Sequence, residues 1–449
     1  MVAPSQSPAG RRPTGMTGLV VVLAGQAVSI LASNMTGFAL SIWVFQKTSS
    51  ATALGGMTSA FTIPYLLLIP LAGVFVDRYS RKLMMMVSDL TAALGTLAIF
   101  ILFASDHLQI WHFYIINGFI GLGSAFQWPA YSAAITTMVP KEQYGRANGM
   151  VSVVQAGPAI IAPLMAGSLM PSIGLTGILL IDLVTFLLAI GALLLVQVPA
   201  PARTVEGQQG QGSLWKEATF GFKYIFQRPS LLGIVIILFL ANLFLGFPNS
   251  VQIPLVLMRT GNSSLILGAV QTAGAISWTV GSVIMSAWGG FKNRIHGVLI
   301  GWSLYCVFGN ILYGLGRGLN IWVPANLIAG VFSSLGIASS TALLQAKTAP
   351  DVQGRVFSAR RLLTWAPDMF TPILGGMLAD RVMEPGMQSG GWMTILFGWM
   401  VGKEAGSGMA VMMVIFGSLT ILTLLAGYLY LPVRDMEKIL PDHDQLEKV

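Results

Sequence analysis

The sequence predicts an all-α polytopic membrane protein, with 12 transmembrane helices in two pseudo-symmetric six-helix bundles. The first observation is composition, because 54% of the 449 residues are hydrophobic and 9% are charged. Soluble domains carry about 25% charged residues. The second is that apolar stretches of about 20 residues, the length of a membrane-crossing helix, separate clusters of charge. Strand barrels are excluded, because their spans are shorter and alternate in polarity. The third observation is an internal repeat.

Each apolar stretch is assigned to one membrane-crossing helix. The approximate cores are residues 16–45, 51–76, 83–105, 110–136, 147–171, 175–197, 231–257, 264–290, 296–316, 321–346, 357–380 and 408–431. A polar connection after the sixth core leaves six spans on each side. The predicted units are an N-terminal tail (1–15), an N-terminal bundle (16–198), a linker with an amphipathic helix (199–230), a C-terminal bundle (231–431) and a C-terminal tail (432–449).

The distribution of lysine and arginine predicts that both tails face the cytoplasm. In that arrangement 20 of the 25 basic residues lie in cytoplasmic segments, as the positive-inside rule requires. The net charge of +8 therefore reflects orientation in a membrane rather than nucleic-acid binding. The first apolar run is too long for a signal-peptide core, so we expect it to remain as the first helix.

The internal repeat relates the fifth span to the eleventh. Residues 145–167 read GRANGMVSVVQAGPAIIAPLMAG, and residues 354–376 read GRVFSARRLLTWAPDMFTPILGG. Proline and glycine alter the backbone of membrane helices, so their coincidence in register is informative. Without gaps, Gly145, Arg146, Pro158, Pro163 and Gly167 align with Gly354, Arg355, Pro367, Pro372 and Gly376. Related halves of this kind are typical of rocking transporters, whose binding site lies at the midplane between the halves.

A charged loop, GVFVDRYSRK, connects the second and third spans. The residues that define its pattern are Gly73, Asp77, Arg78, Arg81 and Lys82. In pattern and placement it resembles the signature loop of the major facilitator superfamily. The resemblance implies a cytoplasmic gate, in which Asp77 faces the positive N-terminus of helix 11. A positive-inside anchor alone would explain the cations but neither Asp77 nor Gly73.

The gate reading has physical support in the residue types. Gly73 would let a neighbouring helix approach closely, and the loop cations would hold to the anionic inner leaflet. The start of helix 11 carries Arg355, Arg360 and Arg361.

Softer motifs narrow the resemblance. The stretches TGFALSIWVFQKTSSATALG, VSDL and ILLIDLVTF look like the bacterial macrolide-efflux and siderophore-exporter branch of the superfamily. This implies a secondary exporter in the inner (plasma) membrane that uses the proton gradient and alternating access. Helix 4 departs from many proton-driven antiporters, because NGFIGLGSAF has no preceding arginine. Alternatives are a lipid or lysolipid translocator, a siderophore exporter and, remotely, an intramembrane enzyme.

Three acids within spans are candidate coupling residues, because charge inside a bilayer is expensive and usually functional. Asp368 lies about 20 Å along its helix from Arg355, near mid-membrane. It could exchange a proton during transport, or accept a hydrogen bond between helices. Asp89 and Asp182 lie nearer the membrane faces, where we favour structural roles.

The resemblance implies that helices 1, 4, 7 and 10 line a substrate cavity. The candidate contacts are Gln26, Asn34, Gln127, Trp128 and Asn242. Each could instead join helices by a hydrogen bond. Gln26, Ser29, Ser33 and Thr36 share one helical face. The few charges in these spans favour neutral or weakly cationic cargo.

Enzymatic function and bound cofactors are not expected. The chain has no Walker loop, and its four histidines lack metal-ligand spacing. The single cysteine, Cys306, is expected to pack within a helix. We expect a monomer whose partners are small amphipathic organic molecules, protons and membrane lipids, without nucleic acid.

Overall fold

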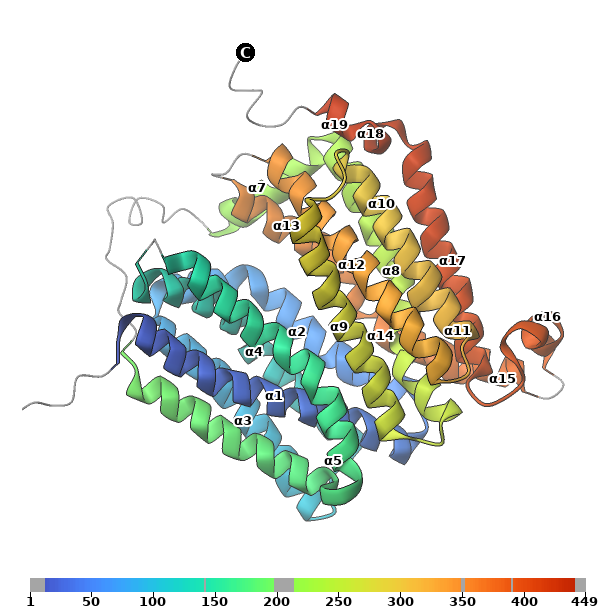
Figure 1. Cartoon of the computed structure of the whole chain (residues 1–449), viewed down its shortest axis with the longest axis horizontal. Helices are drawn as coiled ribbons and strands as arrows, with labels where there is room; N and C mark the ends of the chain where they lie inside the picture. Colours follow the sequence, from blue (N-terminus) through green and yellow to red (C-terminus); the bar gives the residue numbers. More distant parts are fainter. Residues whose placement is uncertain (1–12, 141–142, 198–213, 349–351, 389–390, 441–449) are drawn as a thin grey trace, which may run out of the picture.

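The N-terminal half of the molecule is a bundle of long helices (Figure 1). The structure, a computed structural model, describes residues 13–140, 143–197, 214–348, 352–388 and 391–440. The helices of this half are α1 (Gly15–Thr48), α2 (Ala51–Arg78), α3 (Arg81–Ala104), α4 (Ile110–Met138) and α5 (Tyr144–Leu195). With 52 residues, α5 comprises two rods joined at Gly174, whose φ of 64° suits glycine. This half therefore holds six rods.

The C-terminal half contains four continuous spanning helices and two that are broken into shorter segments. The continuous ones are α8 (Pro229–Arg259), α9 (Ser264–Trp288), α12 (Leu319–Lys347) and α17 (Ser407–Leu429). One broken rod joins α10 (Arg294–Tyr305), the π-helix η2 (Cys306–Leu312) and α11 (Tyr313–Leu315). The other joins α13 (Gln353–Trp365), the 3₁₀ turn η3 (Ala366–Met369), α14 (Thr371–Leu378), the π-helix η4 (Ala379–Met383) and α15 (Glu384–Met387).

Four short helices lie outside these rods. They are α7 (Leu214–Phe226), α16 (Trp392–Val401), α18 (Leu431–Arg434) and α19 (Met436–Ile439). The helix α7 packs against α13, and an added Cβ on Gly221 would collide with the backbone carbonyl of Arg355. Only glycine permits this close approach.

The fold is that of an all-α multi-pass membrane protein. Within the described residues, nine helices are long and apolar enough to cross a membrane. One of these nine, α5, contributes two spans. Adding α4 and the broken rod through α13 and α14 gives the predicted set of 12. Large apolar side chains cover the outer surface, with Leu187 71% and Leu422 61% exposed. Such a surface suits contact with lipid rather than water.

The two halves meet at one end of the molecule and diverge at the other (Figure 1). We call these the closed end and the open end; α7, α18 and α19 lie at the open end. Two equivalent helix crossings form the closed end, α5 with α9 and α14 with α2. This pairing follows the repeat, because α5 and the rod containing α14 are its two copies.

Glycines permit the close approach at both crossings. An added Cβ on Gly268 would lie 2.5 Å from the Pro163 carbonyl oxygen, and one on Gly55 would collide with the Pro372 carbonyl. Four residues further along each repeat copy, Gly167 and Gly376 pack against the backbone at Ser264 and Ala51. The aligned prolines and glycines of the repeat therefore occupy equivalent contacts.

An acid reinforces one of the two crossings. Asp380, on η4, accepts hydrogen bonds from the backbone N–H groups of Ala51 (3.0 Å) and Thr52 (2.9 Å) and from the hydroxyls of Ser50 and Thr52 (both 2.7 Å). The carboxylate thus caps the N-terminus of α2, where the helix dipole favours a negative charge. Pro171 occupies the equivalent position in the other repeat copy, so only one crossing has this cap.

Replacing Asp380 with alanine should weaken the closed end. Hydrogen bonds to a charged group contribute about 1.5–3 kcal/mol, so the population with separated halves should rise roughly tenfold or more. Pulsed electron paramagnetic resonance can measure this with spin labels at His107→Cys and Asn320→Cys, two exposed closed-end positions. Asp435→Ala, an exposed ion-paired acid at the open end, is the control. An unchanged distance distribution for Asp380→Ala would contradict the capping role.

Candidate functional site

A cavity of about 1130 Å³ lies between the two halves and is lined by both. Its walls come from α2 and α4 on one side and from α8, α10, α12, α13 and η3 on the other, with Phe222 of α7 also lining it. A second cavity of about 590 Å³ lies beside it and shares Tyr65, Trp365 and Asp368. The second includes closed-end residues such as Gly55 and Pro372, so the two together lead inward from the open end.

A break in a helix positions Asp368. The helix α13 ends at Trp365, and the 3₁₀ turn η3 carries Pro367 and Asp368 before α14 begins at Thr371. Proline lacks an N–H donor and weakens a regular helix, which favours a break here, although the aligned Pro158 and Pro163 lie within the continuous helix α5. Asp368 lines both cavities. Among the described residues, its carboxylate receives no hydrogen bond and no ion pair.

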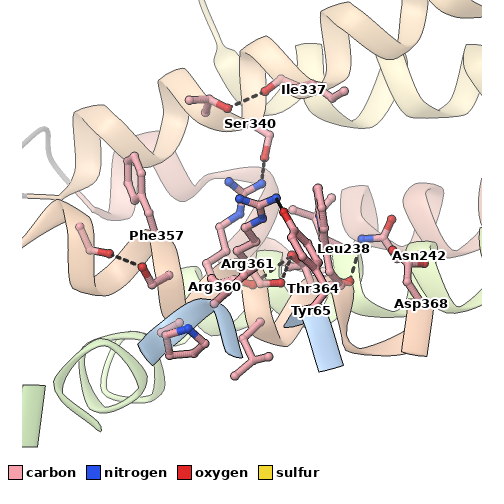
Figure 2. Close-up of a pocket in the computed structure, with 18 of the residues that line it drawn as sticks. Tyr65, Leu238, Asn242, Ile337, Ser340, Phe357, Arg360, Arg361, Thr364 and Asp368 are labelled. Atoms are coloured by element: carbon pink, nitrogen blue, oxygen red, sulfur yellow. Dashed lines mark hydrogen bonds between the residues drawn. The ribbon is translucent and has the colours of Figure 1, made fainter. Parts of the chain in front are cut away.

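Three arginines of α13, Arg355, Arg360 and Arg361, lie in the wall of the larger cavity, and Figure 2 labels the last two. Arg360 donates a hydrogen bond to the Ser340 hydroxyl of α12. Arg361 lies 3.5 Å from the Tyr65 hydroxyl of α2, and its guanidinium carbon lies 4.4 Å from the centre of the Trp365 ring. The sequence predicts these arginines only at the start of helix 11 and does not place them in the cavity. Their spacing from the proline break could have indicated their depth.

Two of the five residues predicted to contact substrate line the larger cavity. Trp128 is 51% exposed and faces this space from α4. Asn242 lies opposite on α8, where its side-chain amide donates a hydrogen bond of 2.9 Å to the Thr364 carbonyl (Figure 2). A third, Asn34, is exposed and lies one turn before Gly37, which lines the second cavity.

The other two, Gln26 and Gln127, bind a buried acid. Asp89 is 3% exposed and accepts hydrogen bonds from the side-chain amides of Gln26 and Gln127, the latter at 3.4 Å. This cluster joins α1, α3 and α4 inside the N-terminal half. Neutral amides compensate the carboxyl, and no described cation pairs with it. In this conformation Gln26 lies inside the bundle and does not line either cavity.

A second buried acid repeats this arrangement. Asp182, on the second rod of α5, accepts hydrogen bonds from the hydroxyls of Ser33 (3.0 Å) and Thr96 (3.2 Å). The polar face of α1 that the sequence revealed is thus turned toward the acids of α3 and α5. These contacts join helices within the N-terminal half, and the structural roles of Asp89 and Asp182 stay predictions.

The signature loop is only partly described. The side chains of Asp77 and Arg78 and the surroundings of Gly73 are not described, although α2 runs through Arg78. Arg81 donates a hydrogen bond of 2.9 Å to the Thr137 hydroxyl of α4. Lys82 donates to the carbonyls of Leu194 (3.2 Å) and Val196 (2.8 Å), at the end of α5. A cation is favourable at a helix C-terminus, so both residues fasten the loop to the N-terminal half.

The described residues contain no group of three or more histidine, cysteine, aspartate or glutamate side chains that could hold a metal ion. Cys306 is buried and free. The cavity between the halves is therefore the site considered below.

Comparison with protein families places this architecture among known transporters. The family model "Major Facilitator Superfamily" matches residues 22–366. Macrolide efflux protein A of Streptococcus pyogenes is 27% identical over 366 residues, covering 80% of this chain and 89% of that protein. Multidrug resistance protein 1 of Bacillus subtilis is 26% identical, covering 74% of this chain and 82% of that protein.

Solved structures show the same fold. A bacterial homologue of the human lysosomal transporter Spinster, in an inward-facing and unoccupied conformation, aligns with a TM-score of 0.69 and 15% identity. The alignment covers 94% of this chain and 98% of that one. A bacterial homologue of the iron transporter ferroportin in an inward-facing state aligns with a TM-score of 0.63 and 14% identity. At these identities the likeness concerns the fold alone.

Proposed function

Because the chain belongs to the major facilitator superfamily and is therefore a transporter rather than an enzyme, we propose that it is a proton-coupled secondary exporter of amphipathic organic molecules. The observation that carries this proposal is the cavity between the halves, which is open at one end while glycine contacts close the other. Such a geometry supports alternating access, in which the halves rock about a central site. The names of the macrolide-efflux and multidrug relatives support export of organic compounds.

In this proposal the open end faces the cytoplasm of a bacterial plasma membrane, as the lysine and arginine distribution indicates. The signature loop would then close the open end when the halves rock. Asp77, near the end of α2, would meet the N-terminus of α13 in the other half, as Asp380 meets the N-terminus of α2 at the closed end. The same interaction, an aspartate at a helix N-terminus of the opposite half, would thus close each end in turn.

Replacing Asp77 with asparagine should slow transport without reducing the amount of folded protein. The amide keeps the shape of the side chain but loses the charge that the α13 N-terminus favours. Turnover in proteoliposomes, normalised to protein by size-exclusion chromatography, measures the effect. Asp106→Asn, an exposed acid in the loop between α3 and α4, is the matched control. Normal turnover of Asp77→Asn would refute the gate.

Asp368 is the candidate coupling acid, because it lies at the proline break and borders both cavities. A carboxyl without a described partner can bind and release a proton as the cavity changes its exposure. Asp89 and Asp182 have neutral partners that hold them within the bundle, so they are weaker candidates for coupling.

Replacing Asp368 with asparagine should abolish uphill export and leave substrate binding intact. Inverted vesicles with an imposed pH gradient measure dye or macrolide accumulation, and a protonophore should abolish it in the wild type. Asp182→Asn is the control for loss of an intramembrane acid. Unchanged uphill transport by Asp368→Asn would exclude this residue, and wild-type transport insensitive to protonophore would remove proton coupling.

A lysolipid translocator is the second candidate, because Arg360 and Arg361 put positive charge into a cavity wall that is also rich in apolar side chains. Movement of a labelled lysolipid between leaflets of proteoliposomes, without dye or macrolide export, would select this function instead.

A further inference from the structure

The arginine pair of the cavity lacks a charged partner. Among the described residues, Arg360 and Arg361 form no ion pair, and the Nε atom of each is buried without a hydrogen bond. Each guanidinium has five N–H donors, but the described contacts are the single bonds to Ser340 and Tyr65. Uncompensated charge within a membrane is expensive. An anion in the cavity would therefore be bound favourably.

The pair lies too deep to serve mainly the signature loop. Arg361 meets Tyr65, which precedes Asp77 by 12 positions along α2, a rise of about 18 Å. The cavity acid, Asp368, lies two helical turns beyond the arginines, about 10–12 Å along the rod, and Figure 2 shows it on the far side of Thr364. Asp368 forms no ion pair with either guanidinium group.

The surroundings of the pair favour an amphipathic ligand. Arg361 is stacked on Trp365, which orients its planar group, and planar guanidinium groups bind carboxylate and phosphate oxygens in pairs. Most of the remaining wall is apolar. It includes Trp128, Leu238, Leu245, Trp302 and Phe357.

We propose that this cavity binds amphipathic anions, with a phosphate or carboxylate group on Arg360 and Arg361 and the apolar body against the aromatic wall. This proposal rests on the proposed export function and assigns anionic cargo, in place of the neutral or weakly cationic cargo expected from the sequence. That expectation treated Arg360 and Arg361 as residues of the helix end, outside the cavity.

Equilibrium binding to the full-length protein in nanodiscs of neutral lipid tests this site without transport. The probe is radiolabelled palmitoyl lysophosphatidate, and the neutral comparison is monopalmitin. The wild type should prefer the anion, and Arg360→Gln or Arg361→Gln should weaken its binding about tenfold, the loss expected for a hydrogen bond to a charged group. Monopalmitin binding should not change. Arg361→Lys should retain much of the preference for charge.

Arg228→Gln is the matched control, because Arg228 also stacks on an aromatic ring, that of Tyr224, but does not line the cavity. Equal binding of the two probes by the wild type, or wild-type binding by both glutamine variants, would overturn the site. Inorganic phosphate should not compete at the same concentration. If it competes equally, the ligand is a free anion and the amphipathic class is wrong.

The proposed function can fail separately from this site. If lysophosphatidate binds through the arginines but no amphipathic anion is moved in proteoliposomes, export is refuted and the binding site stands. If export occurs but shows no preference for anions in any variant, the site is refuted and export stands.

A second feature is independent of the cavity. The helix α16 has an apolar face that nothing in the described chain covers. Trp392, Ile395, Leu396 and Trp399 are 63%, 84%, 56% and 83% exposed, and their spacing places them on one side of the helix. Met393, Gly398 and Val401 are buried on the other side, where α16 contacts α11, α15 and α17.

The position of α16 indicates what covers this face. At 10 residues it is about 15 Å long, half the thickness of the hydrocarbon core. Figure 1 shows it at the lateral edge of the C-terminal half, beside the closed-end tip of α17 and away from the other half. That is the level where spanning helices leave the bilayer, and tryptophan is favoured at this interface.

We infer that α16 lies in the membrane interface of the leaflet at the closed end, with its tryptophan face inserted among lipids. Exposed tryptophan and aliphatic side chains at this level are favoured among lipids rather than in water. The neighbouring loop residue Ala405 is exposed on the same connection and should remain in water.

Spin-label accessibility in proteoliposomes tests this placement. With Cys306 replaced by alanine, single cysteines at Ile395 and Trp399 should be more accessible to oxygen than to a water-soluble nickel chelate, as should lipid-facing Leu422→Cys. Ala405→Cys should show the reverse. High accessibility to both reagents at 395 and 399 would place α16 in water. Low accessibility to both would mean that protein, such as a second copy of the chain, covers the face. Either result would overturn the inference.

Discussion

Close backbone contact at the closed end is the constraint on which the rest of the structure depends. Two crossings bring Gly55 and Gly268 against proline carbonyls of the opposite half, and no larger residue could take their places without separating the helices. Because the halves are held together there, they diverge toward the other end and leave a cavity between them. Tightly packed interfaces of this kind favour discrete arrangements over gradual deformation. The same glycines therefore close one end and create the site.

The two halves place their membrane-embedded charged residues differently. The N-terminal half keeps Asp89 and Asp182 inside its bundle and satisfies them with neutral amides and hydroxyls. The C-terminal half directs Asp368, Arg360 and Arg361 toward the cavity. The two π-helical segments and the 3₁₀ turn of the described chain also lie in the C-terminal half, and such segments often mark functional sites. The two repeat copies thus share a backbone frame, and one copy alone carries charged residues at the positions of Arg360, Arg361 and Asp368.

Much of this could be predicted from the sequence. Span length, the repeat and the depth of Asp368 follow from helix geometry and from proline and glycine spacing. Helical periodicity also showed that Gln26 and Ser33 share a face, but it cannot say toward which neighbour that face is turned. The structure turns it toward Asp89 and Asp182, which are distant in sequence. Asp380 was not predicted as a cap, because its partners on α2 lie more than 300 positions away.

One broken rod connects the charged features of the C-terminal half. Within it, Arg360 and Arg361 precede Asp368, Asp380 follows, and α16 lies just beyond. A ligand held between Arg361 and Trp128 would contact both halves and draw them together at the open end. The Asp380 cap holds the same halves together at the closed end. A ligand can shift a conformational equilibrium only through contacts that differ between the states. In this broken rod, Arg361 at the proposed ligand site and Asp380 at the closed end lie on connected helical segments. A ligand bound at Arg361 would therefore make contacts that differ between the two states.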